Sequence, residues 1–135
     1  MSVELKRDKT HALAQTVAIN RHSLSADVSP KEGGDDAGPS PHDLYDAALG
    51  ACKAITVMWY ARKKGLPVED VNTVVTRDDS GERAGIYKLT ATLQIRGELS
   101  DAQLLELEAV AKKCPVHKLM ATVTTEIDTH VQRLQ

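Results

Sequence analysis

The sequence contains no phenylalanine, one tryptophan and three tyrosines among its 135 residues. Proteins that bind single-stranded nucleic acid stack bases on aromatic side chains, so this chain offers few such platforms. Its 17 basic and 19 acidic residues give a formal net charge of −2, which leaves no excess of basic charge. Nucleic acid is therefore not an expected partner. A core must be built mainly from alanine, valine, leucine and isoleucine.

Long apolar runs are missing as well. The longest apolar stretch covers residues 47–61, is interrupted by Lys53, and is too short to cross a bilayer. The first residues also lack the charged head and apolar run of a secretory signal. We therefore expect a cytoplasmic protein without a membrane partner.

Cysteine is scarce, since only Cys52 and Cys114 occur. Two cysteines in a chain without a visible export signal are expected to be thiols rather than a disulfide scaffold. Cys52 falls inside a predicted helix, where a small buried core residue is the alternative reading. Cys114 comes directly before Pro115 at the predicted start of another helix, with two lysines ahead of it. A helix N-terminus and cationic neighbours favour the thiolate, which is the nucleophilic form.

A length of 135 residues fits one domain, residues 1–135, and the order of the predicted elements indicates an α+β fold with helices packed on a sheet. Turn and capping residues set the boundaries, with Ser40 and Asp43 forming one capping box and Ser100 and Gln103 another. The expected order is a hairpin (13–28), a loop (29–41), a long helix (41–64), two strands (71–77 and 87–96), two helices (from 100 and from 114) and a final strand (123–127).

The long helix is expected to bury one apolar face. That face would hold Leu44, Ala48, Ala51, Ile55, Met58 and Trp59. Cys52 is expected at its margin. The residues expected to point away are Asp46, Lys53, Tyr60 and Lys64.

His117 follows Cys114 by one helical turn, so its ring is a candidate to accept the thiol proton. The same spacing also suits a metal, with Cys52 or His42 completing the set. Structural zinc sites usually show two paired clusters, and here there is one. No metal or cofactor is therefore expected, and His11, His22 and His130 are expected at turns or on the surface.

Three segments resemble the OsmC/Ohr family of osmotically inducible and organic-hydroperoxide-resistance proteins. They are Gly38–Leu44 (GPSPHDL), Ala47–Cys52 (AALGAC) and Cys114–Lys118 (CPVHK). The resemblance implies a two-layer OsmC-like fold built as an intertwined homodimer, with active sites at the subunit interface. It also implies that Cys52 is the peroxidatic thiol and Cys114 the resolving thiol. A dithiol reductant, for example a lipoyl group, would then reduce the disulfide.

The sequence departs from the family pattern around the first cysteine. Family peroxidases pair this cysteine with an arginine from an N-terminal strand, and a glutamate ten residues before the cysteine holds that arginine. Here His42 takes the glutamate position, Asp43 follows it, and the predicted strand contains no arginine. Arg7 and Arg21 flank that strand and are the candidates to replace it.

Two functions from different classes follow. The first is a thiol-dependent peroxidase that reduces organic hydroperoxides or hydrogen peroxide in oxidative stress defence, with His42, Asp43 and His117 as supporting residues. The second is a non-catalytic dimer that binds a small apolar or thiol-reactive ligand in the interface cleft.

Overall fold

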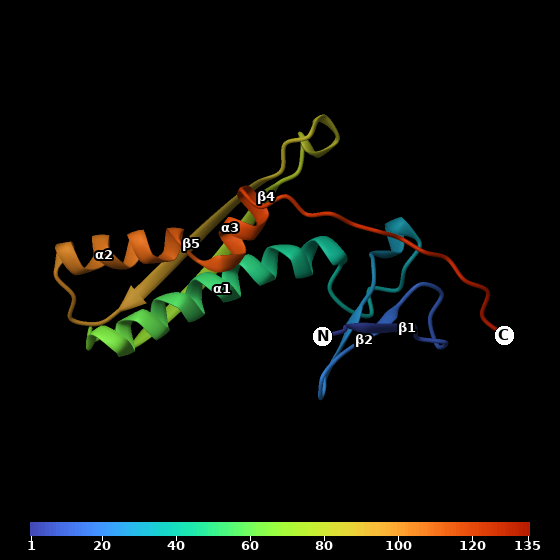
Figure 1. The fold of residues 1–135 in the computed structure, drawn as a ribbon, viewed down its shortest axis with the longest axis horizontal. Helices are drawn as coiled ribbons and strands as arrows, with labels where there is room; N and C mark the ends of the chain where they lie inside the picture. Colours follow the sequence, from blue (N-terminus) through green and yellow to red (C-terminus); the bar gives the residue numbers. More distant parts are fainter. The chain divides into compact units, whose positions relative to one another are not determined.

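The computed structural model describes residues 1–135 and shows an α+β chain with three α-helices and two small sheets (Figure 1). It divides into two compact units, residues 1–50 with 74–92, and residues 51–73 with 93–135. We call these the N-terminal unit and the C-terminal unit. Helix α1 (Pro41–Lys64) and the paired strands β4 (Asp70–Asp78) and β5 (Lys88–Arg96) contribute to both.

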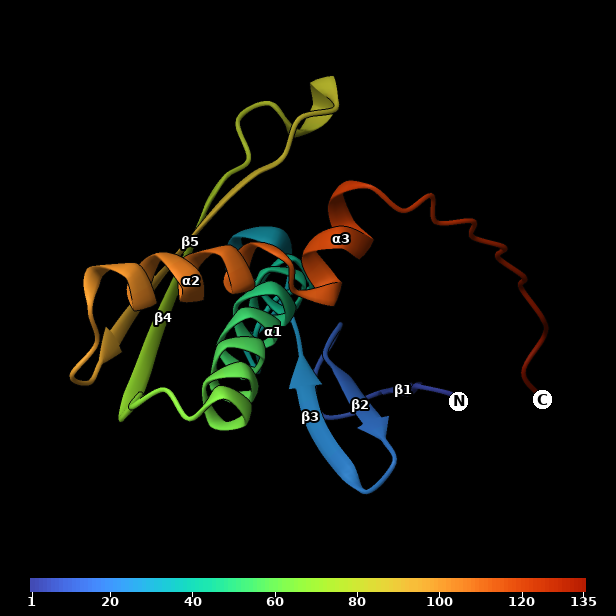
Figure 2. The same cartoon turned by 60° about the vertical axis from the view of Figure 1, so that its left-hand side comes forward.

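The N-terminal unit contains an antiparallel three-stranded sheet in the order β1-β2-β3 (Figure 2). Its strands are β1 (Glu4–Arg7), β2 (Gln15–Ile19) and β3 (His22–Ala26). The predicted hairpin is confirmed, and its turn begins at Asn20, which adopts a positive φ of 54°. Strand β1 was not predicted, because its four residues are all exposed and show no buried alternation.

The loop after β3 is held by Asp27, a carboxylate that is only 4% exposed. It accepts backbone N–H groups from Val28, Asp35 and Ala37 at 2.8 to 3.1 Å. These hydrogen bonds, led by that from Ala37, hold the pKa of Asp27 below its usual value. The loop includes the short helix η1 (Pro30–Glu32) and leads into α1.

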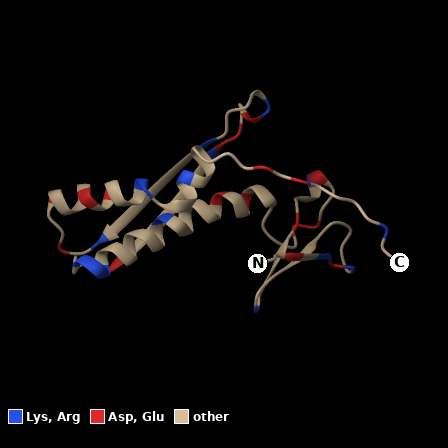
Figure 3. Cartoon of the chain, in the orientation of Figure 1, with Lys and Arg blue, Asp and Glu red and all other residues tan.

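Helix α1 begins with the predicted capping box. The Ser40 hydroxyl accepts the Asp43 N–H at 3.1 Å, and the Asp43 carboxylate accepts the Ser40 N–H at 3.0 Å. Arg62, Lys63 and Lys64 form its last turn, where positive charge is favourable (Figure 3). None of the helices in the chain has the length and apolar character needed to cross a membrane.

The C-terminal unit has its own core, in which α2 (Asp101–Lys112) packs against the second half of α1. Leu107 and Val57 are fully buried at its centre. The buried members of this core are Val57, Ala61, Leu107 and Ala111. Ser100 and Gln103 form the predicted capping box of α2, with both reciprocal hydrogen bonds present. Short helix α3 (Pro115–Ala121) follows.

The predicted outward face of α1 is wrong at two positions. Asp46 and Lys53 were expected in solvent, yet each is only 7% exposed, whereas Ile55 and Trp59 of the expected buried face are 68% and 59% exposed. Hydrophobicity alone misplaced the face because both buried charges have specific polar partners, described below. Lys63 places its Nζ 4.9 Å from the centre of the Trp59 ring, yet Ile55 and Trp59 stay largely exposed, and such exposed apolar patches commonly mark contact surfaces.

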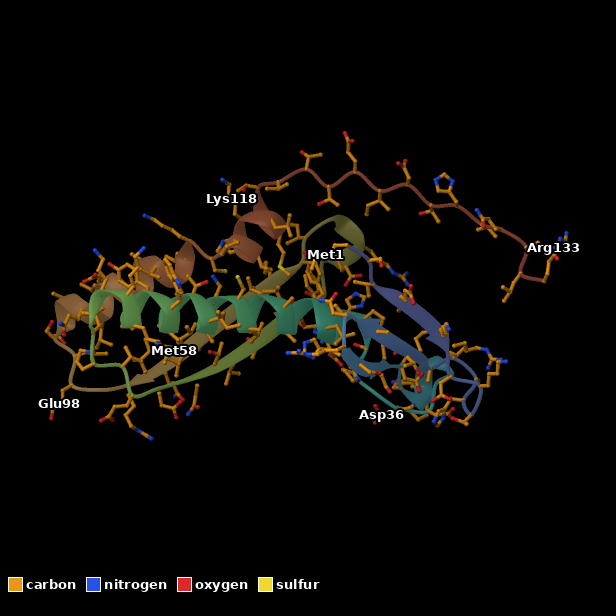
Figure 4. The ribbon with its side chains drawn as sticks, turned by 60° about the horizontal axis from the view of Figure 1, so that its bottom comes forward. Met1, Asp36, Met58, Glu98, Lys118 and Arg133 are labelled. Atoms are coloured by element: carbon orange, nitrogen blue, oxygen red, sulfur yellow. The ribbon has the colours of Figure 1, made fainter.

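The final strand predicted at 123–127 is not formed. The chain after α3 runs on without helix or strand to Gln135, and all of its residues are exposed (Figures 1 and 4). Beyond Val123 no backbone hydrogen bond holds this segment. A strand needs an edge to pair with, and this segment has no paired edge within the chain.

Candidate active site

Cys52 lies on α1 in the C-terminal unit and is half-buried with a free thiol. Its sulfur lies 4.0 Å from the hydroxyl oxygen of Thr56, one helical turn along. Thr56 also lines a pocket of about 410 Å³ formed by α1 and α2, together with Tyr60, Glu106, Ala109, Val110 and Lys113. The thiol therefore contacts Thr56, which lines this cavity, whereas Cys52 itself is not among the lining residues.

Cys114 is the N-cap residue of α3, as the sequence predicted, and it is fully buried as a free thiol. Its sulfur accepts the backbone N–H of His117 at 3.4 Å. A sulfur at the start of a helix lies next to free N–H donors, although α3 is short. Thus the main chain of His117 donates to the sulfur, whereas Nδ1 of its ring lies 2.8 Å from Nζ of Lys53.

Lys53 connects the two cysteine motifs. Its Nζ lies 2.8 Å from Nδ1 of His117 and donates to the carbonyl oxygen of Ala111 at 2.9 Å. Lys53 follows Cys52 directly, and Ala111 and His117 lie three residues before and three residues after Cys114. The structure therefore joins the helix of the first thiol to the segment that carries the second.

His42 and Asp43 belong to the N-terminal unit, where each has a specific partner. Nε2 of His42 lies 3.0 Å from a carboxylate oxygen of Glu82 in the short helix η2 (Glu82–Ala84), and its ring packs edge-on against Tyr87. The Asp43 carboxylate forms an ion pair with Arg77 of β4. The Ser40 N–H, followed by Arg77, lowers the pKa of Asp43.

Arg77 was not singled out from the sequence, although it is the arginine that the start of α1 holds. Its Nε donates to the Asp46 carboxylate at 2.7 Å. The hydroxyl of Tyr87 donates to the same carboxylate at 2.6 Å. This network explains why Asp46 is buried, since a buried carboxylate needs charged or hydrogen-bonding partners. Arg7, one of the expected replacements, instead donates to the carbonyl oxygen of His11.

Tyr87 gives a testable consequence of this network. Burial, together with the hydrogen bond to Asp46, raises the pKa of Tyr87 to about 12, from about 10 in an unfolded chain. Between these values the unfolded chain loses the proton first, so stability falls as pH rises. We expect a tyrosinate absorbance titration of the wild type to show a step near pH 12, and we expect that step to be absent in Tyr87→Phe. Tyr45→Phe is the control and should retain that step. Persistence of that step in Tyr87→Phe would contradict the assignment.

The structure brings together no group of three histidine, cysteine or acidic side chains that could hold a metal ion. Neither Cys52 nor His42 extends the pair of Cys114 and His117 into such a group.

Comparison with known proteins defines the family. A family model described as OsmC-like protein matches residues 33–129, which is most of the chain and includes both cysteines. This chain belongs to the OsmC-like protein family. None of the curated proteins matches its sequence.

Solved structures share the fold of this OsmC-like protein. An OsmC-like protein from Mycoplasma pneumoniae has a TM-score of 0.72 at 20% identity, covering 90% of this chain and 87% of its own. An organic hydroperoxide resistance protein OsmC from Legionella pneumophila has a TM-score of 0.65 at 19% identity, covering 90% of both chains. The organic hydroperoxide resistance protein OhrB of Bacillus subtilis has a TM-score of 0.58 at 20% identity, again covering 90% of both. At these identities the likeness shows the fold.

Sequence reasoning missed two charged residues with specific partners. Lys53 contacts His117 in the C-terminal unit, and Arg77 pairs with the carboxylates at the start of α1 in the N-terminal unit. Lys53 could have been noticed from its spacing, since Lys53, Val57 and Ala61 recur every four residues along the helix that carries Cys52. Arg77 gives no comparable signal, because its partners Asp43 and Asp46 are more than thirty residues away in the sequence.

Proposed function

We propose that this OsmC-like protein is a thiol-dependent peroxidase that uses Cys52 and Cys114 to reduce organic hydroperoxides or hydrogen peroxide. The observation that carries the proposal is the junction of the two cysteine motifs, formed by the contact of Lys53 with His117 at 2.8 Å. Both thiols are free, and both belong to the C-terminal unit. Relatives of this fold are named for organic hydroperoxide resistance, which supports a role in oxidative stress defence.

The chemistry needs two steps and a reductant. The Cys52 thiolate attacks the terminal oxygen of the hydroperoxide, the O–O bond breaks, and the alkoxide takes a proton and leaves as an alcohol. This leaves a sulfenic acid on Cys52. The Cys114 thiol then attacks that sulfur, the S–O bond breaks, and water leaves as the disulfide forms. A dithiol such as a lipoyl group restores both thiols by exchange.

A homodimer is the expected assembly. Ile55 and Trp59 are largely exposed on the apolar face of α1, and the exposed C-terminal segment carries Ile127, Val131 and Leu134 without a paired edge. Both features are what a chain shows when a partner covers part of its apolar surface. A second copy would supply that cover.

A second candidate function is supported by a groove of about 910 Å³ on this exposed face of α1. Met58, labelled in Figure 4, lies on it with Ile55 and Trp59. For this candidate we propose that a small apolar ligand binds there, in the cleft between two copies, without turnover. The absence of the family's N-terminal-strand arginine and the replacement of its glutamate by His42 also favour this candidate.

A single-turnover titration separates the two candidates. Reduced protein is mixed with one equivalent of cumene hydroperoxide, and thiols and intact mass are then read. A peroxidase is expected to lose both thiols per peroxide, with a mass decrease of about two hydrogens. Thiols that survive a slight excess of peroxide for minutes would contradict the peroxidase and favour the ligand-binding dimer.

A further inference from the structure

Lys53 is the one buried lysine of the C-terminal unit, and it has no carboxylate partner. It is 7% exposed and forms no ion pair with any aspartate or glutamate. Burying an ammonium group is costly unless its hydrogen atoms are satisfied. A buried cation that lacks a counter-charge must therefore be held in place by the polar groups around it.

Those groups come from the two sides of Cys114. The Ala111 carbonyl belongs to the last turn of α2, where the helix dipole makes the carbonyl end negative and favours a cation. The other partner, Nδ1 of His117, belongs to the first turn of α3. Lys53 therefore contacts both helices that meet at the second thiol.

The contact with His117 also selects one tautomer of its ring when Lys53 carries its ordinary positive charge. A lysine ammonium has three donors and no acceptor, so Nδ1 of His117 must accept the hydrogen bond. The nitrogen that is not engaged then carries the proton, which leaves a neutral ring with hydrogen on Nε2. In this arrangement Nδ1 is not free to take a proton from a thiol.

We propose that Lys53 is a positioning residue for the second thiol. By donating hydrogen bonds to the Ala111 carbonyl oxygen and to Nδ1 of His117, it holds the segment of Cys114 against the helix of Cys52. When Cys52 carries a sulfenic acid, this placement lets the Cys114 thiol react with it before a second peroxide oxidises it further. This rests on the proposed peroxidase function for its consequence in turnover, although the positioning itself does not.

The variant Lys53→Met keeps the length of the side chain and removes every donor. Lys64→Met makes the same change at an exposed position at the end of the same helix and serves as the matched control. Lys53→Arg keeps donors and is the conservative rescue. If Lys53→Met does not fold, Lys53→Gln, which keeps one N–H pair at shorter reach, takes its place.

The first readout needs no peroxide. Nitrogen-15 NMR of the reduced wild-type protein should show His117 neutral with its proton on Nε2. The fixed tautomer should be lost in Lys53→Met and kept in Lys64→Met and Lys53→Arg. A wild-type ring with its proton on Nδ1, or a tautomer unchanged by Lys53→Met, overturns the proposal.

The second readout is the rate of disulfide formation between Cys52 and Cys114 with diamide, an oxidant that takes two electrons from a dithiol. We expect it to fall about tenfold in Lys53→Met, as the loss of one charged hydrogen bond would give. With cumene hydroperoxide, the ratio of disulfide to sulfinic acid should fall by a similar factor. An unchanged diamide rate overturns the positioning role. If diamide oxidation is slowed in Lys53→Met but the wild type does not react with cumene hydroperoxide, the positioning role is supported and the peroxidase function is overturned.

Discussion

Cys52→Ser is expected to abolish peroxide consumption. A serine hydroxyl cannot form a sulfenic acid, so the covalent step is lost while the small, half-buried site beside Thr56 keeps its shape. The rate should fall about a thousandfold or more, as when other enzymes lose their nucleophile. The rate is measured as peroxide consumption coupled to a dithiol reductant. Equal activity in Cys52→Ser and the wild type would contradict the proposed peroxidase function.

Cys114→Ser is the companion variant, with a different expected outcome. It should complete one turnover and then be over-oxidised by further peroxide, because no second thiol traps the sulfenic acid. Intact mass should next show Cys52 gaining two and then three oxygens as peroxide is added. Repeated turnover with a dithiol reductant would show instead that the reductant resolves Cys52 directly.

Leu107→Ala is expected to destabilise the C-terminal unit strongly. Leu107 is fully buried among Val57, Ala61 and Ala111, so its truncation leaves a cavity in a core built of small side chains. Leucine-to-alanine changes at such positions cost about 2 to 5 kcal/mol in the free energy of unfolding. Urea denaturation followed by far-ultraviolet circular dichroism measures the loss.

Leu105→Ala on the same helix is the matched control, because Leu105 is 67% exposed. We expect it to change the free energy of unfolding by no more than about 0.5 kcal/mol. Similar losses in the two variants would mean that the packing of α2 described above is wrong, or that another surface buries Leu105.

The parts of the fold that sequence reasoning predicted are those set by neighbouring residues. Ser40 with Asp43, and Ser100 with Gln103, each satisfy N–H groups three positions away, so the helix starts could be placed from the sequence. Cys114 before Pro115 placed the start of α3 in the same way.

The parts that it missed depend on partners far away in the chain. Asp46 and Lys53 are charged, so periodicity placed them in solvent, whereas Arg77 and Tyr87 satisfy the first and His117 the second. The spacing of Lys53 with Val57 and Ala61 indicates that Lys53 is buried, but no local pattern identifies the partner of either charge. The final strand failed for a related reason, since alternation at 123–127 shows that a segment can be a strand but not that an edge exists to receive it.

The unequal exposure of the two thiols bears on how oxidation of this protein must be read. Cys114 has no surface exposed to solvent, whereas Cys52 is partly exposed. A bulky maleimide or aromatic disulfide dye added to the native protein should therefore report a single fast-reacting sulfur per chain. Only a thiol count made after denaturation gives the full value of two free thiols per reduced chain. A count on the native protein alone would make fully reduced protein look half oxidised.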